Sequence, residues 1–184
     1  MADKPARDVN VNAVPQNLEA EQCLLGCILL DDNLAQELVP TLKAEDFYAP
    51  SHRILLSAMQ KVLNESKPID FVTVADALDR SGQLAAAGGI NYLTTLNTVV
   101  PSSANYRVYL KIVERNSVLR ALIRAGTSII EECRNSDDEE RSVAFAEKAV
   151  YDISDKKQSG DLTPVGESTG EVLTIFDELY KNQG

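Results

Sequence analysis

The stretch NYRVYLKIVERNSVLRALIRAGTSIIEECR, residues 105–134, decides the fold of this chain. It contains no proline, and Gly126 is its single glycine. Proline and glycine are the residues least favourable inside a helix, so a run almost free of both favours one long helix. Aliphatic residues recur along it at helical spacing and form a stripe: Ile112, Leu119, Leu122 and Ile129.

A second helix is expected directly after this one. Ser136 is followed three residues later by Glu139, the pattern of a capping box, which predicts a helix from Ser136 to about Asp155. Its apolar residues also repeat at helical spacing: Val143, Ala146, Val150 and Ile153. Two helices with such stripes and a short polar loop form an antiparallel hairpin, which we assign to residues 104–156.

Beyond the hairpin the sequence becomes polar and then periodic again. Residues 157–163 are predicted to be a hinge, because they include Ser159 and Gly160. Residues 164–184 are predicted to form an amphipathic linker helix, with Val172, Phe176 and Leu179 on its apolar face. A short helix of this kind is marginal in water and needs a partner.

The sequence before the hairpin alternates short apolar runs with breaks. Residues 1–16 read as a flexible arm, and residues 17–103 as a compact head of short helices, which makes the whole chain all-α. Asn17, Ser51 and Asp70 are predicted helix caps, and a broad apolar stripe after Asn17 predicts a helix central to the core. The breaks fall at Pro40, Pro68, Gly82, Gly88, Gly89 and Pro101.

Composition excludes several functional classes. The formal net charge is −10, so the chain should repel nucleic acid and anionic membrane surfaces. No run approaches the roughly 18 apolar residues of a membrane span. Three cysteines make no disulfide framework, and the polar N-terminus has no signal-peptide core, so a cytoplasmic protein is expected.

The sequence contains no complete catalytic or cofactor-binding motif that we recognise. His52, the single histidine, is expected to be an ordinary residue at a helix start, with one side of its ring packed and the other in water. Cys23 and Cys27 lie four apart, either as half of a thiolate metal site or, as we favour, as two small buried hydrophobes. No phosphate-binding loop of the form G-x-x-x-x-G-K-[ST] occurs. We therefore expect no catalytic, cofactor or metal site.

Two surface patterns of the long helix have open interpretations. A basic stripe could meet a phosphate backbone, although pairing with acidic residues is favoured: Arg107, Lys111, Arg115, Arg120 and Arg124. Val113, Ile123 and Ile130 lie beside the hairpin stripe and widen it. These apolar residues either form a protein interface or are covered by the head, and the sequence does not separate the two.

Five ordered patterns resemble the N-terminal domain of bacterial replicative DNA helicases, the DnaB family. Their order and spacing match over about residues 14–134. The patterns are NLEAEQCLLGCILLD at 17–31, DFYAPSHRI at 46–54, PIDFVTV at 68–74, GGINYL at 88–93 and PSSAN at 101–105.

The resemblance implies an N-terminal domain and linker whose C-terminal ATPase motor, with its ATP and Mg²⁺ sites, is absent from this chain. This fragment would then be no enzyme, whereas its parent would be an ATP-dependent helicase. Such domains form a collar, a trimer of dimers, that recruits primase and the helicase loader. The primase-contact residues implied are Tyr92, Ile123 and Ile129. Ile129 was also assigned to the hairpin stripe, so two interpretations compete there.

The resemblance further implies that the linker helix docks on a neighbouring motor domain through Val172, Phe176 and Leu179. Two other hypotheses stand beside the collar: a free-standing helical adaptor and a small helical enzyme. A coding sequence that continues into a phosphate-binding loop would remove the adaptor hypothesis.

Overall fold

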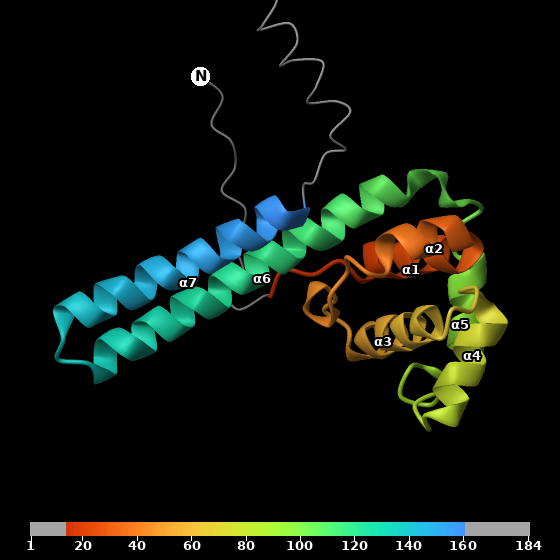
Figure 1. Cartoon of the computed structure of the whole chain (residues 1–184), viewed down its shortest axis with the longest axis horizontal. Coiled ribbons are helices and arrows are strands. Elements are labelled where there is room, and N and C mark those ends of the chain that lie inside the picture. Colours follow the sequence, from red (N-terminus) through yellow and green to blue (C-terminus); the bar gives the residue numbers. More distant parts are fainter. Residues whose placement is uncertain (1–13, 161–184) are drawn as a thin grey trace, which may run out of the picture. The chain divides into compact units, whose positions relative to one another are not determined.

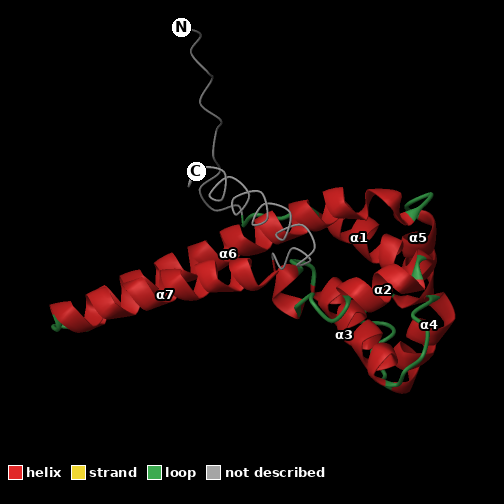
Figure 2. Cartoon of the chain, turned by 45° about the horizontal axis from the view of Figure 1, so that its top comes forward, coloured by secondary structure: helices red, strands yellow, loops and turns green. Residues whose placement is uncertain are grey.

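A computed structural model describes residues 14–160, and all regular structure in this part of the chain is helical (Figures 1 and 2). The prediction of an all-α fold is confirmed. The linker helix, most of the arm and the end of the hinge lie outside the described residues. The elements are α1 (Leu18–Leu30), α2 (Asp32–Leu38), η1 (Ala44–Asp46), α3 (Pro50–Asn64), α4 (Phe71–Arg80), α5 (Gly89–Thr98), η2 (Ser103–Asn105), α6 (Tyr106–Asn135) and α7 (Glu139–Gly160).

The chain divides into two compact units between Ile123 and Arg124. The first contains α1 to α5 and the beginning of α6, and the second contains the end of α6 and α7. We had placed the whole long helix in the hairpin. Its first part instead joins the head, because Val113, Asn116 and Arg120 are buried there.

Helix α1 lies at the centre of the first unit, as its broad stripe predicted. Every residue from Ala20 to Leu29 except Gln22 is buried. α1 crosses α5 at Gly26, where an added Cβ would lie 2.6 Å from the carbonyl oxygen of Leu96. Close backbone approach therefore fixes this crossing, and no larger residue fits there.

Most of the predicted helix ends are confirmed. The side-chain oxygen of Asn17 accepts a hydrogen bond from the Ala20 amide (2.9 Å) at the start of α1. Asp70 and Thr73 bind each other's backbone N–H groups at the start of α4, as in a capping box. Gly82 ends α4 with a φ of +66°, a conformation that glycine adopts without strain.

Two predicted caps are wrong. α3 begins at Pro50 rather than behind a Ser51 cap, because the fixed φ of proline suits the first helical position. α7 is capped by Asp138, whose Oδ1 accepts from the Arg141 amide (3.0 Å). The Ser136 hydroxyl instead binds the backbone of Asp138 within the turn. Both residues are good caps, so the sequence could not separate them.

Helix α7 is longer than predicted. It continues to Gly160, so residues 157–160 are helical rather than part of the hinge. Lys156, Lys157 and Gln158 are good helix formers, which agrees with a longer helix.

Candidate interaction surfaces

Glu21 is a buried charge at the centre of the first unit. It lies on the same face of α1 as Leu24, Leu25 and Ile28, and it is 2% exposed. Its carboxylate accepts hydrogen bonds from the backbone amides of Tyr48 (2.7 Å) and Ala49 (3.3 Å), just before α3. Glu21 stands in the first turn of α1, yet its carboxylate binds the chain that leads into α3.

The same carboxylate binds His52 of α3, with 2.6 Å between Oε2 and Nδ1. Burial alone would raise the pKa of Glu21. The hydrogen bonds from His52, Tyr48 and Ala49 together outweigh it, so the pKa lies below its usual range. Glu21 is thus an ionised acceptor that joins α1 to α3.

His52 continues this network to Tyr92 of α5. Its Nε2 lies 2.5 Å from the Tyr92 hydroxyl oxygen, and the planes of the two rings are within 8° of parallel. Gln22 donates to the same hydroxyl from Nε2 (3.0 Å). His52 is only 2% exposed, so our expectation of a half-solvated ring is wrong. Glu21 supplies the polar partner that makes its burial possible.

Tyr92 itself is half-buried. Burial raises the pKa of its hydroxyl. Gly88 lies against its side chain, since a Cβ added there would meet Cβ, Cγ and Cδ1 of Tyr92 at 2.8 Å. The side chain is therefore held at its hydroxyl and beside its Cβ and ring.

The beginning of α6 is anchored by polar contacts with the first unit. Arg120 is 4% exposed and donates to the carbonyl oxygens of Pro15 (2.9 Å), Glu45 (3.3 Å) and Asp46 (2.7 Å). Ser117 donates to the Asp46 carboxylate (2.8 Å). The sequence placed Arg120 in a basic stripe that meets either a phosphate backbone or acidic residues, but the structure shows it bound to backbone carbonyls. It satisfies backbone carbonyls inside the first unit.

The apolar residues of α6 separate into two groups. Val113 is 1% exposed and belongs to the core, so its assignment to a surplus surface is wrong. Ile123 and Ile130 are 50% and 52% exposed. Ile123 is therefore not covered by the rest of the first unit.

The hairpin of the second unit has no core of its own in its described part. Between Arg124 and Asp155 no side chain is buried. Within this unit, only three residues of the two predicted apolar stripes are half-buried: Ile129, Ala146 and Ile153. The exposed large apolar or aromatic residues are Ile130, Val143, Phe145, Val150 and Tyr151. Helices in proteins owe most of their stability to tertiary packing. These exposed apolar residues are therefore suited to pack against another protein surface.

The cysteines are structural rather than reactive in the first unit. Cys23 and Cys27 are buried, and burial raises the pKa of both thiols, that of Cys27 to about 11. This supports small hydrophobes over thiolate ligands. Cys133 in the second unit is exposed.

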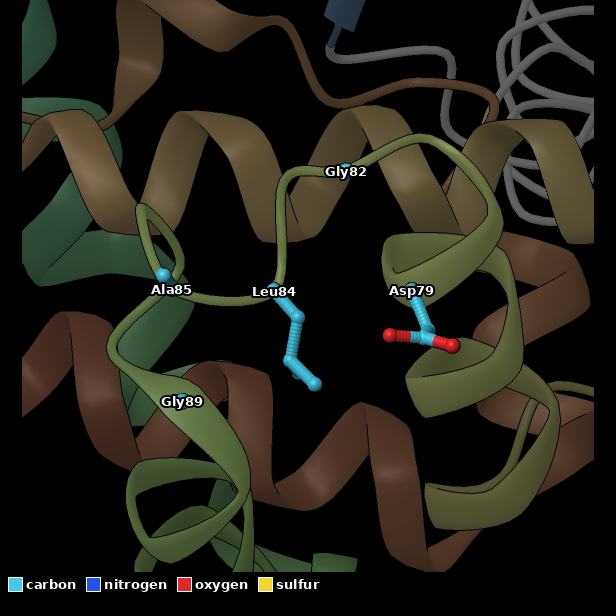
Figure 3. Close-up of a pocket in the computed structure, with 5 residues that line it drawn as sticks. All are labelled: Asp79, Gly82, Leu84, Ala85 and Gly89. Atoms are coloured by element: carbon cyan, nitrogen blue, oxygen red, sulfur yellow. The ribbon is translucent and has the colours of Figure 1, made fainter.

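A pocket beside the end of α4 offers little chemistry (Figure 3). Its lining consists of Asp79, Gly82, Leu84, Ala85 and Gly89, so a single carboxylate is its only ionisable group. Across residues 14–160, no group of three or more His, Cys, Asp and Glu side chains could hold a metal ion.

The sequence matches the family described as the DnaB-like helicase N-terminal domain over residues 13–115, more than half of the chain. The chain belongs to this family. The resemblance found in the five sequence patterns is confirmed.

Curated DnaB-family relatives are replicative helicases. The chain is 35% identical to the replicative DNA helicase DnaB of Geobacillus stearothermophilus over 92% of its own length and 38% of the relative's. It is 33% identical to the replicative DNA helicase DnaC of Bacillus subtilis over 96% and 39%. The chain thus spans less than half the length of these relatives.

Solved structures agree with the DnaB-type fold. The crystal structure of the N-terminal domain of DnaB helicase from Mycobacterium tuberculosis matches with a TM-score of 0.71 and 36% identity, over 77% of this chain and 99% of that one. A DnaB-like replicative helicase, described with its interactions with primase, matches with a TM-score of 0.66 and 25% identity, over 91% and 37%. None of the helices within residues 14–160 is long and apolar enough to cross a bilayer.

The primase-contact candidates implied by the DnaB resemblance fall on both units. Tyr92 and Ile123 lie in the first, on α5 and α6, and Ile129 lies in the second. Ile123 is exposed, whereas Tyr92 and Ile129 are half-buried. The motor-docking candidates Val172, Phe176 and Leu179 lie outside the described residues.

Sequence reasoning missed Glu21 as a functional partner of His52 and Tyr92 in this DnaB-type head. One signal was available: Glu21 interrupts an apolar stripe, and a charged residue in such a position needs a buried partner. The single histidine was the obvious candidate, but a sequence separation of 31 positions hid the pairing.

Proposed function

We propose that this chain is the assembly and recruitment module of a bacterial replicative helicase, which self-associates and binds primase. The observation that carries the proposal is the uncovered apolar surface of α6 and α7 in a DnaB-family domain, where Ile123 and Ile130 are both about half exposed. Exposed apolar surface of this kind marks protein interfaces.

Primase is the proposed partner of Tyr92 and Ile123 in the first unit and, separately, of Ile129 in the second. A matching DnaB-like helicase is described with its interactions with primase, which supports this choice. An exposed isoleucine and a half-buried tyrosine are suited to an apolar contact. We propose the helicase loader as a further partner of the same collar.

The parent protein of this module would be an ATP-dependent motor that acts in the cytoplasm, since the relatives are replicative DNA helicases. ATP and Mg²⁺ would then bind in a separate motor domain. Val172, Phe176 and Leu179 are proposed to dock the linker helix on the motor of a neighbouring subunit.

The primase surface is tested by Ile123→Asp. A charge placed in an apolar contact is costly, and truncated hot-spot anchors often lose about 2 kcal/mol, or about thirtyfold in Kd. The measurement is calorimetric titration of the chain with primase from the same organism. Val108→Asp is the matched control, because Val108 is equally apolar, 57% exposed and on the same helix. Equal affinities for the two variants would refute this placement.

A further inference from the structure

We propose that His52, oriented by Glu21, is a positioning residue that commits the Tyr92 hydroxyl to the interior, so that primase meets only the ring. The inference rests on the proposed primase surface. It specifies that primase contacts the ring of Tyr92, and that the buried residues Glu21 and His52 hold this ring in place.

The donor inventory fixes the first of these hydrogen bonds. The Glu21 carboxylate can only accept, and it already accepts from two backbone amides, so His52 carries a proton on Nδ1 and donates. A neutral imidazole accepts from the Tyr92 hydroxyl at Nε2, and a protonated one donates to the hydroxyl oxygen, so Tyr92 is bonded to His52 in both forms. The Tyr92 oxygen accepts from Gln22.

The Tyr92 hydroxyl thus has two hydrogen-bond partners within the first unit. His52 of α3 binds it through Nε2, and Gln22 of α1 donates to its oxygen. A partner gains little from a hydroxyl that is already satisfied, because a new hydrogen bond would have to replace an existing one. The half-buried ring is what Tyr92 can still offer.

The ring is also held from the side of α5. Gly88 has a φ of +104° and lies so close to Tyr92 that a Cβ there would overlap the side chain. With the hydroxyl bound at one end and Gly88 at the other, the ring has little rotamer freedom to lose. A side chain ordered before binding contributes more to affinity than one ordered on binding.

Two substitutions of His52 separate its two hydrogen bonds. The amide of asparagine reaches the position of Nδ1, so His52→Asn keeps a donor to Glu21 and loses the partner of Tyr92. The amide of glutamine reaches the position of Nε2, so His52→Gln keeps an acceptor for Tyr92 and leaves Glu21 with its two amides. Tyr92→Phe keeps the ring and removes the hydroxyl.

The experiment measures primase Kd by calorimetry for wild type, these three variants and the double variant His52→Asn/Tyr92→Phe. We expect His52→Asn and Tyr92→Phe each to weaken binding about fivefold. The double variant should bind no more weakly than either single one, because both remove the same bond. His52→Gln should keep wild-type affinity although its thermal midpoint falls. A purely structural role predicts instead that affinity follows stability.

Three outcomes would overturn the inference. Unchanged affinity in a folded His52→Asn variant removes the positioning role. Additive losses in the double variant mean that the hydroxyl contacts primase directly. If Tyr92→Ala and Ile123→Asp both bind primase like wild type, the proposed surface itself is wrong. If those two weaken binding and His52→Asn does not, only the positioning role is lost.

Discussion

At the residue scale, Glu21 shows how the first unit keeps a buried charge. Its three donors come from the chain entering α3 and from α3 itself, so the acid on α1 holds two parts of the core together. Removing one partner of a buried charged hydrogen bond usually costs more than the bond itself contributes.

Replacing Glu21 by glutamine should therefore destabilise the fold by about 2 kcal/mol at neutral pH. The folded-state pKa of this carboxyl is lowered, so its stabilisation is present above the unfolded-state pKa and is lost as the pH falls through the folded-state value. The difference in the free energy of unfolding between wild type and Glu21→Gln should accordingly become smaller below about pH 4. Urea unfolding across a pH series measures it.

The control for this series is Glu19→Gln, an exposed acid on the same helix. Its stability should stay within about 0.5 kcal/mol of wild type. If this difference in unfolding free energy for Glu21→Gln stays constant from pH 7 to pH 3, Glu21 is not an ionised acceptor in the folded state.

Gly26 gives a second prediction at this scale. Gly26→Ala places a methyl group 2.6 Å from the Leu96 carbonyl and 2.9 Å from Val99 Cγ1, so α1 and α5 must separate. We expect a loss of about 1–3 kcal/mol in chemical denaturation. Gly126→Ala is the matched control: it too lies inside a helix, nothing lies within 4 Å of its added Cβ, and it should be neutral or stabilising by about 0.5–1 kcal/mol. Equal effects of the two changes would show that packing at the crossing does not matter.

At the element scale, helices were largely predictable because their signals are local. Proline, glycine and cap residues lie within a few positions of the ends they determine, as Asn17, Asp70 and Gly82 show. The errors arose where two good caps compete, as at Ser136 and Asp138. Which part of α6 is buried was not predictable, because the partners of Arg120 lie 74 to 105 residues away.

Part of the candidate primase-contact site was predictable from the sequence, and part was not. Ile123 was visible as surplus on a helix stripe, and its exposure agrees with that interpretation. The inward bonds of Tyr92 were not visible, because His52 and Tyr92 are 40 residues apart and belong to different helices. Periodicity reports which face of one helix is apolar, and it carries no information on which side chains of separate helices meet.

The cap at the start of α7 can be tested by mutation. Asp138→Ala removes the acceptor of the Arg141 amide and should cost about 1 kcal/mol, seen as lost helicity by circular dichroism on heating. Ser136→Ala should cost less, since its hydroxyl binds only the turn backbone. A larger loss for Ser136→Ala would restore the capping box that the sequence suggested.

At the scale of the whole molecule, the second unit lacks buried side chains in its described part, whereas the first has a continuous core. A partner that binds only the folded form of such a unit shifts the folding equilibrium towards that form. Assembly and folding of the hairpin should therefore depend on each other.

Ile130→Asp tests this link. If copies of the chain associate through the hairpin, a charge at this half-exposed position should weaken self-association at least tenfold, measured by light scattering over a concentration series. Ser128→Asp introduces the same charge at an exposed polar position of the same helix and should have little effect. A wild-type chain that stays monomeric at every concentration would count against the assembly role.

The distribution of the three cysteines has a practical consequence. Cys23 and Cys27 are buried with raised thiol pKa values, and the thiolate is the reactive form, so both should resist alkylation. Cys133 stands exposed on the hairpin. A maleimide dye or a nitroxide will thus attach to the native chain at one place without engineering. Energy transfer or spin–spin coupling between labelled copies then reports their encounter directly.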